Sequence, residues 1–95
     1  MTDAQLYGAM YEQCYPRVLA HAASVVGRQA GEDITSETFL VAWRRWTALP
    51  DPPLPWLLGI ARNLIREFRR RSGRQYELYF AYNHIGWSDQ QISTK

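Results

Sequence analysis

Cysteine and long apolar runs are scarce in this chain, and each of these two shortages excludes a class of protein. Cys14 is the only cysteine, so a disulfide framework and a cysteine zinc cluster are excluded and a reducing compartment is expected. No apolar run approaches the roughly 18–20 residues that span a bilayer. The start MTDAQLYGAM lacks a cationic segment followed by an apolar stretch. We therefore expect a cytoplasmic protein with no membrane segment.

Residues that form metal and catalytic sites are also few. His21 and His84 have no cysteine or second histidine at ligand spacing, which argues against a metal site, and His21 is interpreted as a helix-surface or core-edge histidine. The sequence has no glycine-rich phosphate loop and no G-x-S-x-G motif. A helix start explains Glu32 and Asp33, and a helix face explains Glu37. We expect no enzymatic activity, no cofactor and no metal.

Positive charge is present almost entirely as arginine, and it is concentrated. Of the eleven cations, ten are arginine, a side chain that makes bidentate contacts with phosphates and bases. Residues 1–43 hold two arginines and five acidic residues, a net charge of −3, whereas residues 44–74 hold eight arginines and two acidic residues, a net charge of +6. This distribution predicts that residues 44–74 contact a polyanion.

The periodicity of apolar residues predicts an all-α fold, a small three-helix bundle in one domain over residues 1–74. The first helix is expected from Ala4 to Val26, with a bend at Pro16. Its apolar positions recur every three or four residues and are Leu6, Met10, Cys14, Val18, Ala22 and Val25. A second row, Tyr7, Tyr11 and Tyr15, is interpreted as packing at the edge of the core, with a stacking platform for bases as the alternative.

The second helix is expected from Glu32 to Thr47, after a turn at Gly27 to Gly31. Its inner side is predicted to consist of Thr35, Phe39, Ala42, Trp43 and Trp46, and its outer side of Asp33, Glu37, Leu40 and Arg44. A solvated charged face and a partner-binding surface are both compatible with the outer side. The exposed apolar residue Leu40 favours a partner-binding surface.

The third helix is expected from Trp56 to Gly73, after a stiff connector with prolines at 50, 52, 53 and 55. Leu57, Ala61, Leu64 and Phe68 form its apolar stripe, with Ile60 and Ile65 at the edges, and Arg62, Arg66, Arg69 and Arg70 lie opposite. Gly73 is expected to end the helix. Residues 75–95 form an aromatic and then polar tail, with a possible short fourth helix from Tyr76 to about His84.

The order of these segments resembles the second conserved region of bacterial RNA polymerase sigma factors, and most closely the extracytoplasmic-function group. The resemblance covers roughly residues 5–74. It is carried by the pattern E-D-x-x-x-E-x-F-x-x-A-W at Glu32 to Trp43 and the pattern W-L-x-x-I-A-R-N at Trp56 to Asn63. Ser36 stands where the family usually has glutamine, and the connector is short and unusually rich in proline.

The resemblance implies two partners. Asp33, Glu37, Leu40 and Arg44 would dock on the clamp coiled coil of the largest subunit of core RNA polymerase. The third helix and the loop before it would open the promoter minus-ten element and hold its non-template strand. Trp56 and the turn at residues 49–55 would frame a pocket for an unstacked base, while phosphates and base edges would be held by Arg62, Asn63, Arg66, Arg69 and Arg70. An anti-sigma factor is a further implied partner.

Three functions remain open on the sequence. The first is a transcription initiation factor domain that binds polymerase and the minus-ten element. The second is a sigma-derived interaction module that binds polymerase or an anti-sigma regulator without recognising a promoter, and the third is a basic bundle with non-specific affinity for nucleic acid. The sequence has no second helical domain with a helix-turn-helix, which in the family reads the minus-thirty-five element. We therefore expect either a fragment of a longer factor or a sigma-like protein that works differently.

Overall fold

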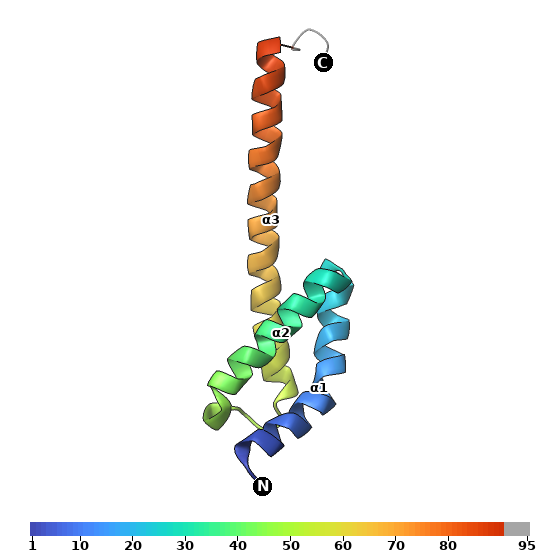
Figure 1. Cartoon of the computed structure of the whole chain (residues 1–95), viewed down its shortest axis with the longest axis vertical. Coiled ribbons are helices and arrows are strands. Elements are labelled where there is room, and N and C mark those ends of the chain that lie inside the picture. Colours follow the sequence, from blue (N-terminus) through green and yellow to red (C-terminus); the bar gives the residue numbers. More distant parts are fainter. Residues whose placement is uncertain (91–95) are drawn as a thin grey trace.

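The computed structural model describes the backbone of residues 1–90 and the side chains of residues 1–73. It contains three α-helices and one short 3-10 helix, which are α1 (Asp3–Val26), α2 (Arg28–Arg44), η1 (Trp46–Ala48) and α3 (Leu54–Gln90). The helices α1 and α2 form a pair, and the first half of α3 packs against both, while its second half projects beyond them (Figure 1). Residues 1–90 include no strand, so the predicted all-α fold is confirmed.

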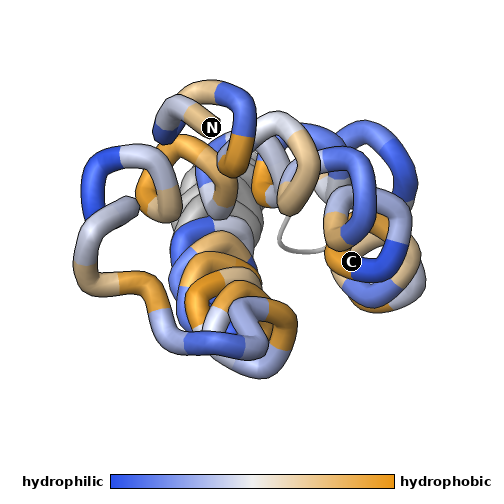
Figure 2. Tube along the Cα trace, turned by 90° about the horizontal axis from the view of Figure 1, so that it is seen from below, coloured by the Kyte–Doolittle hydropathy of each residue, from blue (hydrophilic) through white to orange (hydrophobic). Residues whose placement is uncertain are grey.

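The core is built from one buried row on each helix. Hydrophilic and hydrophobic segments alternate along the helices (Figure 2), as amphipathic helices require. The buried apolar residues are Met10, Cys14, Val18 and Ala22 of α1, Ile34, Phe39 and Ala42 of α2, and Leu57, Ala61 and Ile65 of α3. Most of the predicted core is confirmed. Leu6 and Val25, at the two ends of the predicted α1 row, are instead 41% and 42% exposed.

The inner side of α2 combines apolar and hydroxyl side chains. Thr35 and Thr38 are fully buried, and their hydroxyls donate to the carbonyl oxygens of Gly31 and Ile34 at 2.7 and 2.8 Å. These hydrogen bonds pair the two hydroxyl groups, whose burial without partners would destabilise the folded state. Trp43 was predicted on this inner side but is 46% exposed. It lies at the rim of the core, where its ring packs against that of Tyr7 on α1.

The tyrosine row of α1 packs along the seam with α2, which agrees with its interpretation as the edge of the core. The Tyr7 hydroxyl donates to the backbone carbonyl of Phe39 at 2.7 Å, and its ring meets Trp43 edge-on at 5.0 Å. The ring of Tyr11 lies 4.8 Å from the ring of Phe39 and 4.9 Å from that of Tyr15. Burial, followed by the nearby Tyr11, raises the pKa of the Tyr7 hydroxyl above its ordinary value.

The start and the bend of α1 follow local sequence signals. Thr2 caps the helix, and it exchanges hydrogen bonds with Gln5 in a capping box. Pro16 lies inside the helix, and the N-terminal and C-terminal halves of α1 run in different directions (Figure 1). The predicted bend is therefore confirmed. The helix bends because proline has no N–H group, so one hydrogen bond of the helix is missing at this position.

The beginning of α2 differs from the prediction. The turn consists of Gly27 alone, with a φ of 93°, and α2 begins at Arg28, so the predicted turn to Gly31 and helix start at Glu32 are wrong. Gly31 is buried against α1, where a Cβ atom would lie 2.7 Å from the Cα atom of Ala23. Glycine is needed there for the close approach of two helices and not for a turn. The C-terminal end also differs, since α2 ends at Arg44 and Trp46–Ala48 form η1.

The end of α3 also differs from the prediction. The helix passes through Gly73 without a break and continues to Gln90, so the predicted stop and a separate fourth helix from Tyr76 to His84 are wrong. A glycine in a helix interior costs only about 1 kcal/mol relative to alanine, and no proline follows it in the chain. Despite its 37 residues, α3 is not apolar enough to cross a membrane, and neither is any other helix in residues 1–90.

Candidate nucleic-acid and protein-binding faces

The start of α3 positions its outward face. The helix begins at Leu54, and the N–H of Leu57 donates to the carbonyl of Pro53 at 2.9 Å. Pro55 occupies the first turn, where its missing N–H costs nothing, as predicted. Because Leu57, Ala61 and Ile65 are held in the core, the residues on the other side of α3 are fixed outward.

Four of the six predicted DNA-binding residues come together on this face. Trp56, Arg62, Asn63 and Arg66 line one shallow groove of about 400 Å³, together with Gly59 and Ile60; we call it the Trp56 groove. Trp56 is half-buried and also packs against the core. It therefore serves as core anchor and groove wall at once.

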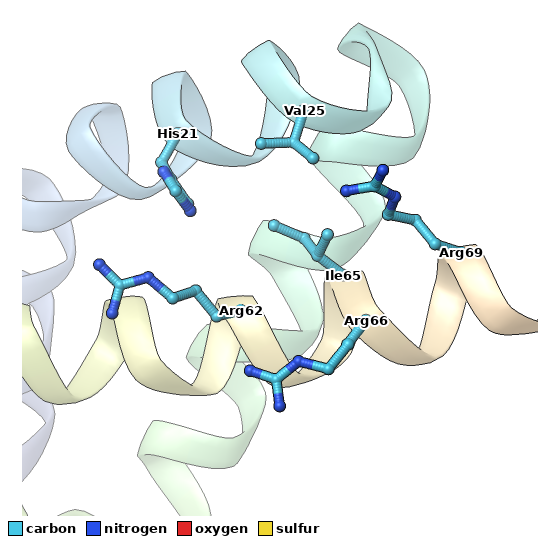
Figure 3. A pocket seen from close by; sticks show the side chains of 6 residues that line it. All are labelled: His21, Val25, Arg62, Ile65, Arg66 and Arg69. Carbon is cyan, nitrogen blue, oxygen red and sulfur yellow. The ribbon is translucent and has the colours of Figure 1, made fainter.

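A second groove of about 340 Å³ lies between α1 and α3. It is lined by His21, Val25, Arg62, Ile65, Arg66 and Arg69, and we call it the α1–α3 groove. Figure 3 shows Arg62, Ile65 and Arg69 reaching from α3 toward α1, with His21 and Val25 reaching back. His21 and Val25 were not predicted as site residues. The available signal was the spacing of Arg17, His21 and Val25, which puts them on one side of a helix.

The remaining predicted residues of the α3 region lie elsewhere. Arg70 is exposed and lines neither groove. The connector residues 49–51 and Pro53 line a further groove with the N-terminal part of α1, including Leu6 and Met10, and not the groove that holds Trp56. Among residues 1–73, the ion pair between Arg28 and Glu32 at 2.9 Å involves none of the α3 arginines. In that part of the chain, no three His, Cys, Asp or Glu side chains form a group that could hold a metal ion.

The outward face of α2 carries the predicted polymerase-docking residues. Asp33, Glu37, Leu40 and Arg44 are all exposed, with Leu40 47% exposed. Their steps of four, three and four residues are the spacing with which one helix meets another along a coiled-coil seam. Arg44 lies in the last turn of α2, where a cation is favoured by the helix dipole.

The acidic face and the arginine grooves lie on different sides of α3. Asp33 and Glu37 line a small groove between α2 and α3 that also contains Arg71. Arg62, Arg66 and Arg69 line instead the groove between α1 and α3. The molecule therefore has two separate exposed faces, one acidic with an exposed leucine and one rich in arginine.

This arrangement defines a small helical domain with one acidic face that carries an exposed leucine and one face rich in arginine. Residues 10–75 match the family described as Sigma-70 region 2, and the chain belongs to that family. It is 42% identical over 69 residues to the probable RNA polymerase sigma factor RfaY of Xanthomonas campestris pv. campestris. The aligned part is 70% of this chain but only 17% of that relative. No solved structure matches the chain. The resemblance to sigma factors is thus confirmed.

Proposed function

We propose that this domain acts in transcription initiation, binding core RNA polymerase through the outward face of α2 and the single-stranded minus-ten promoter element through α3. The observation that carries the proposal is the convergence of Trp56, Arg62, Asn63 and Arg66 in one groove. An aromatic wall, an amide and two guanidinium groups are the components that hold an unstacked base and its phosphates.

The energetics favour a groove of this composition. Opening a promoter without ATP requires binding energy that offsets the lost pairing and stacking of the bases. Stacking of a base on an aromatic side chain contributes about 1–3 kcal/mol, and extruded bases are read by hydrogen bonds to their edges. Arginine contacts to phosphates add a salt-dependent contribution. In this proposal Trp56 and Asn63 bind a base, and Arg62, Arg66, Arg69 and Arg70 hold the phosphates.

The outward face of α2 supplies the proposed contact with polymerase. Its residues Asp33, Glu37, Leu40 and Arg44 present two acids, one apolar side chain and one cation in a row, which suits the clamp coiled coil of the largest subunit. An anti-sigma factor that covered either face would block the corresponding contact.

Selection from a pool of random single-stranded oligonucleotides tests the DNA half of the proposal, because every short sequence is present in the pool and the chain itself chooses among them. The chain is used to enrich binding strands, and the affinity of the enriched sequence is compared with that of its scrambled version. We expect the enriched strand to bind about tenfold more tightly, as for one or two specific base contacts. Equal binding of the two strands would contradict promoter recognition.

Arg66→Ala tests whether the arginine contacts a phosphate. The slope of log affinity against log salt is expected to fall by about 0.7, the value for one phosphate contact on a single strand. Arg71→Ala is the matched control, since Arg71 lies on the α2 side of the same helix, and we expect it to leave the slope unchanged. An unaltered slope in Arg66→Ala would mean that Arg66 contacts no phosphate.

A second candidate function is an interaction module that binds polymerase without recognising a promoter. It is favoured by the separation of the two faces, because the α2 residues do not depend on the Trp56 groove for their exposure. The two candidates differ in one result. A chain that binds polymerase but enriches no sequence from the random pool would be an interaction module.

A further inference from the structure

The α1–α3 groove combines two chemical kinds of lining. Its apolar surface is formed by Val25 and Ile65, and its cationic groups are Arg62, Arg66 and Arg69, joined by the imidazole of His21. Val25 is 42% exposed, so its apolar side chain is accessible to a ligand. A ligand with an anionic part and an apolar part would cover both kinds of surface, and a nucleotide has both, in its phosphate and in its sugar and base.

The two grooves adjoin each other. Arg62 and Arg66 line both the Trp56 groove and the α1–α3 groove, so one surface runs from Trp56 across α3 to Val25 on α1. A strand that occupies the first groove and continues in this direction reaches the second. No acidic residue lines either groove, so the path carries no fixed negative charge that would repel phosphates.

Positive charge extends this path along α1. Arg17 is exposed and precedes His21 by four residues, which places it on the same side of the helix. Cationic groups therefore come from two elements that are distant in sequence. If the arginines of α3 formed only a solvated basic surface, cationic side chains would not be expected on the neighbouring side of α1.

We infer that the α1–α3 groove binds the nucleotides that adjoin those in the Trp56 groove, on the same single strand. Their phosphates lie at Arg62, Arg69 and His21, and a sugar or base covers Val25 and Ile65. This inference rests on the proposed function, since it requires that α3 binds single-stranded DNA. It adds α1 to the DNA-binding surface, and it makes the affinity depend on the length of the strand beyond the sequence-specific element.

The test compares two strand lengths on the whole 95-residue chain. The short strand is an enriched sequence of about 5 nucleotides, and the long strand carries about 5 more at one end or the other, a range typical of single-strand sites. We expect one of the two extensions to tighten binding. Val25→Glu is then expected to weaken binding of that long strand about tenfold, because like charges are brought together, and to leave binding of the short strand unchanged.

The opposite charge gives the opposite effect. Val25→Arg adds a cation to the groove, so we expect it to tighten binding of the long strand and to steepen its salt slope by about 0.7. A purely structural role of Val25 predicts no such gain. His21→Glu is a second variant with the same expected loss, in case Val25→Glu lowers the helicity measured by circular dichroism.

Ala20→Glu and Ala20→Arg are the matched controls, since Ala20 is exposed on α1 and lines neither groove. If these variants change long-strand affinity as much as the Val25 variants do, only the net charge matters and the inference is overturned. It is also overturned if Val25→Glu binds both lengths like the unmodified chain; the preference of the short strand over its scrambled version would then still support the proposed function. Failure of that preference contradicts the proposed function itself.

Discussion

The outward faces of α2 and α3 differ in charge although the two helices share one core. The outward face of α2 presents Asp33, Glu37, Leu40 and Arg44 as a narrow row, whereas that of α3 presents three arginines, one asparagine and a tryptophan around two grooves. Toward the core, each helix contributes one large apolar side chain that is almost fully buried, Phe39 in α2 and Leu57 in α3. The two helices therefore differ on the sides that do not pack in the core, and in the proposed function those sides set the partner of each helix.

Separation of the two faces has a functional consequence. The acidic residues of α2 lie on one side of α3, and the arginines of α3 line the groove on the side of α1. The acidic residues therefore do not neutralise the arginine grooves. Both faces are exposed in the same structure, and the proposed function requires that a protein partner and a nucleic acid bind at the same time. If the two faces are independent, a substitution on one face leaves the other unaffected, whereas a substitution in the common core affects both.

Removal of the common core is expected to have the largest effect. Phe39→Ala truncates a side chain that is 1% exposed, and the lost burial and the cavity together cost about 3–5 kcal/mol. For a small domain this is a large part of the total stability. Urea unfolding followed by circular dichroism measures the loss, and binding of polymerase and of DNA is expected to decline together. Retention of DNA binding alone would show that α3 does not need the bundle.

The neighbouring residue separates binding from folding. Leu40→Asp alters a side chain that is 47% exposed, so we expect stability to change by less than about 0.7 kcal/mol. Loss of an apolar anchor at the centre of an interface corresponds to about 2 kcal/mol, which is roughly a thirtyfold loss of affinity for core polymerase. DNA affinity is expected to stay constant. Ala20→Asp, with the same charge change on α1, is the control, and an equal loss in that variant would contradict a specific docking face.

Two glycines test the packing of α1 on α2. Gly31→Ala places a Cβ atom 2.7 Å from the Cα atom of Ala23, so the helices must move apart, at a cost of about 1–3 kcal/mol. Gly8→Ala is the matched control, because nothing lies within 4 Å of the added atom, and the helix is expected to gain up to about 1 kcal/mol. Thermal unfolding midpoints measure both. A neutral Gly31→Ala would mean that the contact adjusts without strain.

The smallest effect is expected for Tyr7→Phe. It removes the hydroxyl that donates to the Phe39 carbonyl at 2.7 Å, which contributes about 1 kcal/mol. The pKa of Tyr7 is raised in the folded chain by burial and then by Tyr11. Its contribution is therefore complete below the ordinary value of 10.0 and is lost as the pH rises above it. Urea unfolding between neutral and strongly alkaline pH is expected to show a smaller loss of stability in the variant than in the unmodified chain.

The sequence predicted the elements better than it predicted their boundaries and contacts. The apolar period identified Leu57 and Ala61 as core and Arg62 and Arg66 as outward, because helical spacing is a local property. It placed Leu64 and Phe68 in the core ahead of Ile65, whereas Ile65 is buried and the other two are half-buried. The direction from which α1 approaches α3 decides between these positions, and no local pattern contains it.

Glycines caused the wrong boundaries for the same reason. A glycine is compatible with a turn, a helix end or a close contact, and neighbouring residues do not distinguish among them. Gly27 forms the turn with a φ of 93°, Gly31 makes the contact with Ala23, and Gly73 lies in an uninterrupted helix. Only the position of the partner helix explains why Gly31 is buried.

By itself, the sequence determined that three amphipathic helices form, that Pro16 bends the first, and that arginines cover one side of the third, since period and composition are local. The tertiary structure decided which helices meet along which sides. It placed His21 and Val25 opposite the arginines of α3 and kept the acids of α2 away from them. Helix packing depends on side-chain volumes at contacts between residues far apart in the chain, and for that reason the α1–α3 groove appears only in the folded protein.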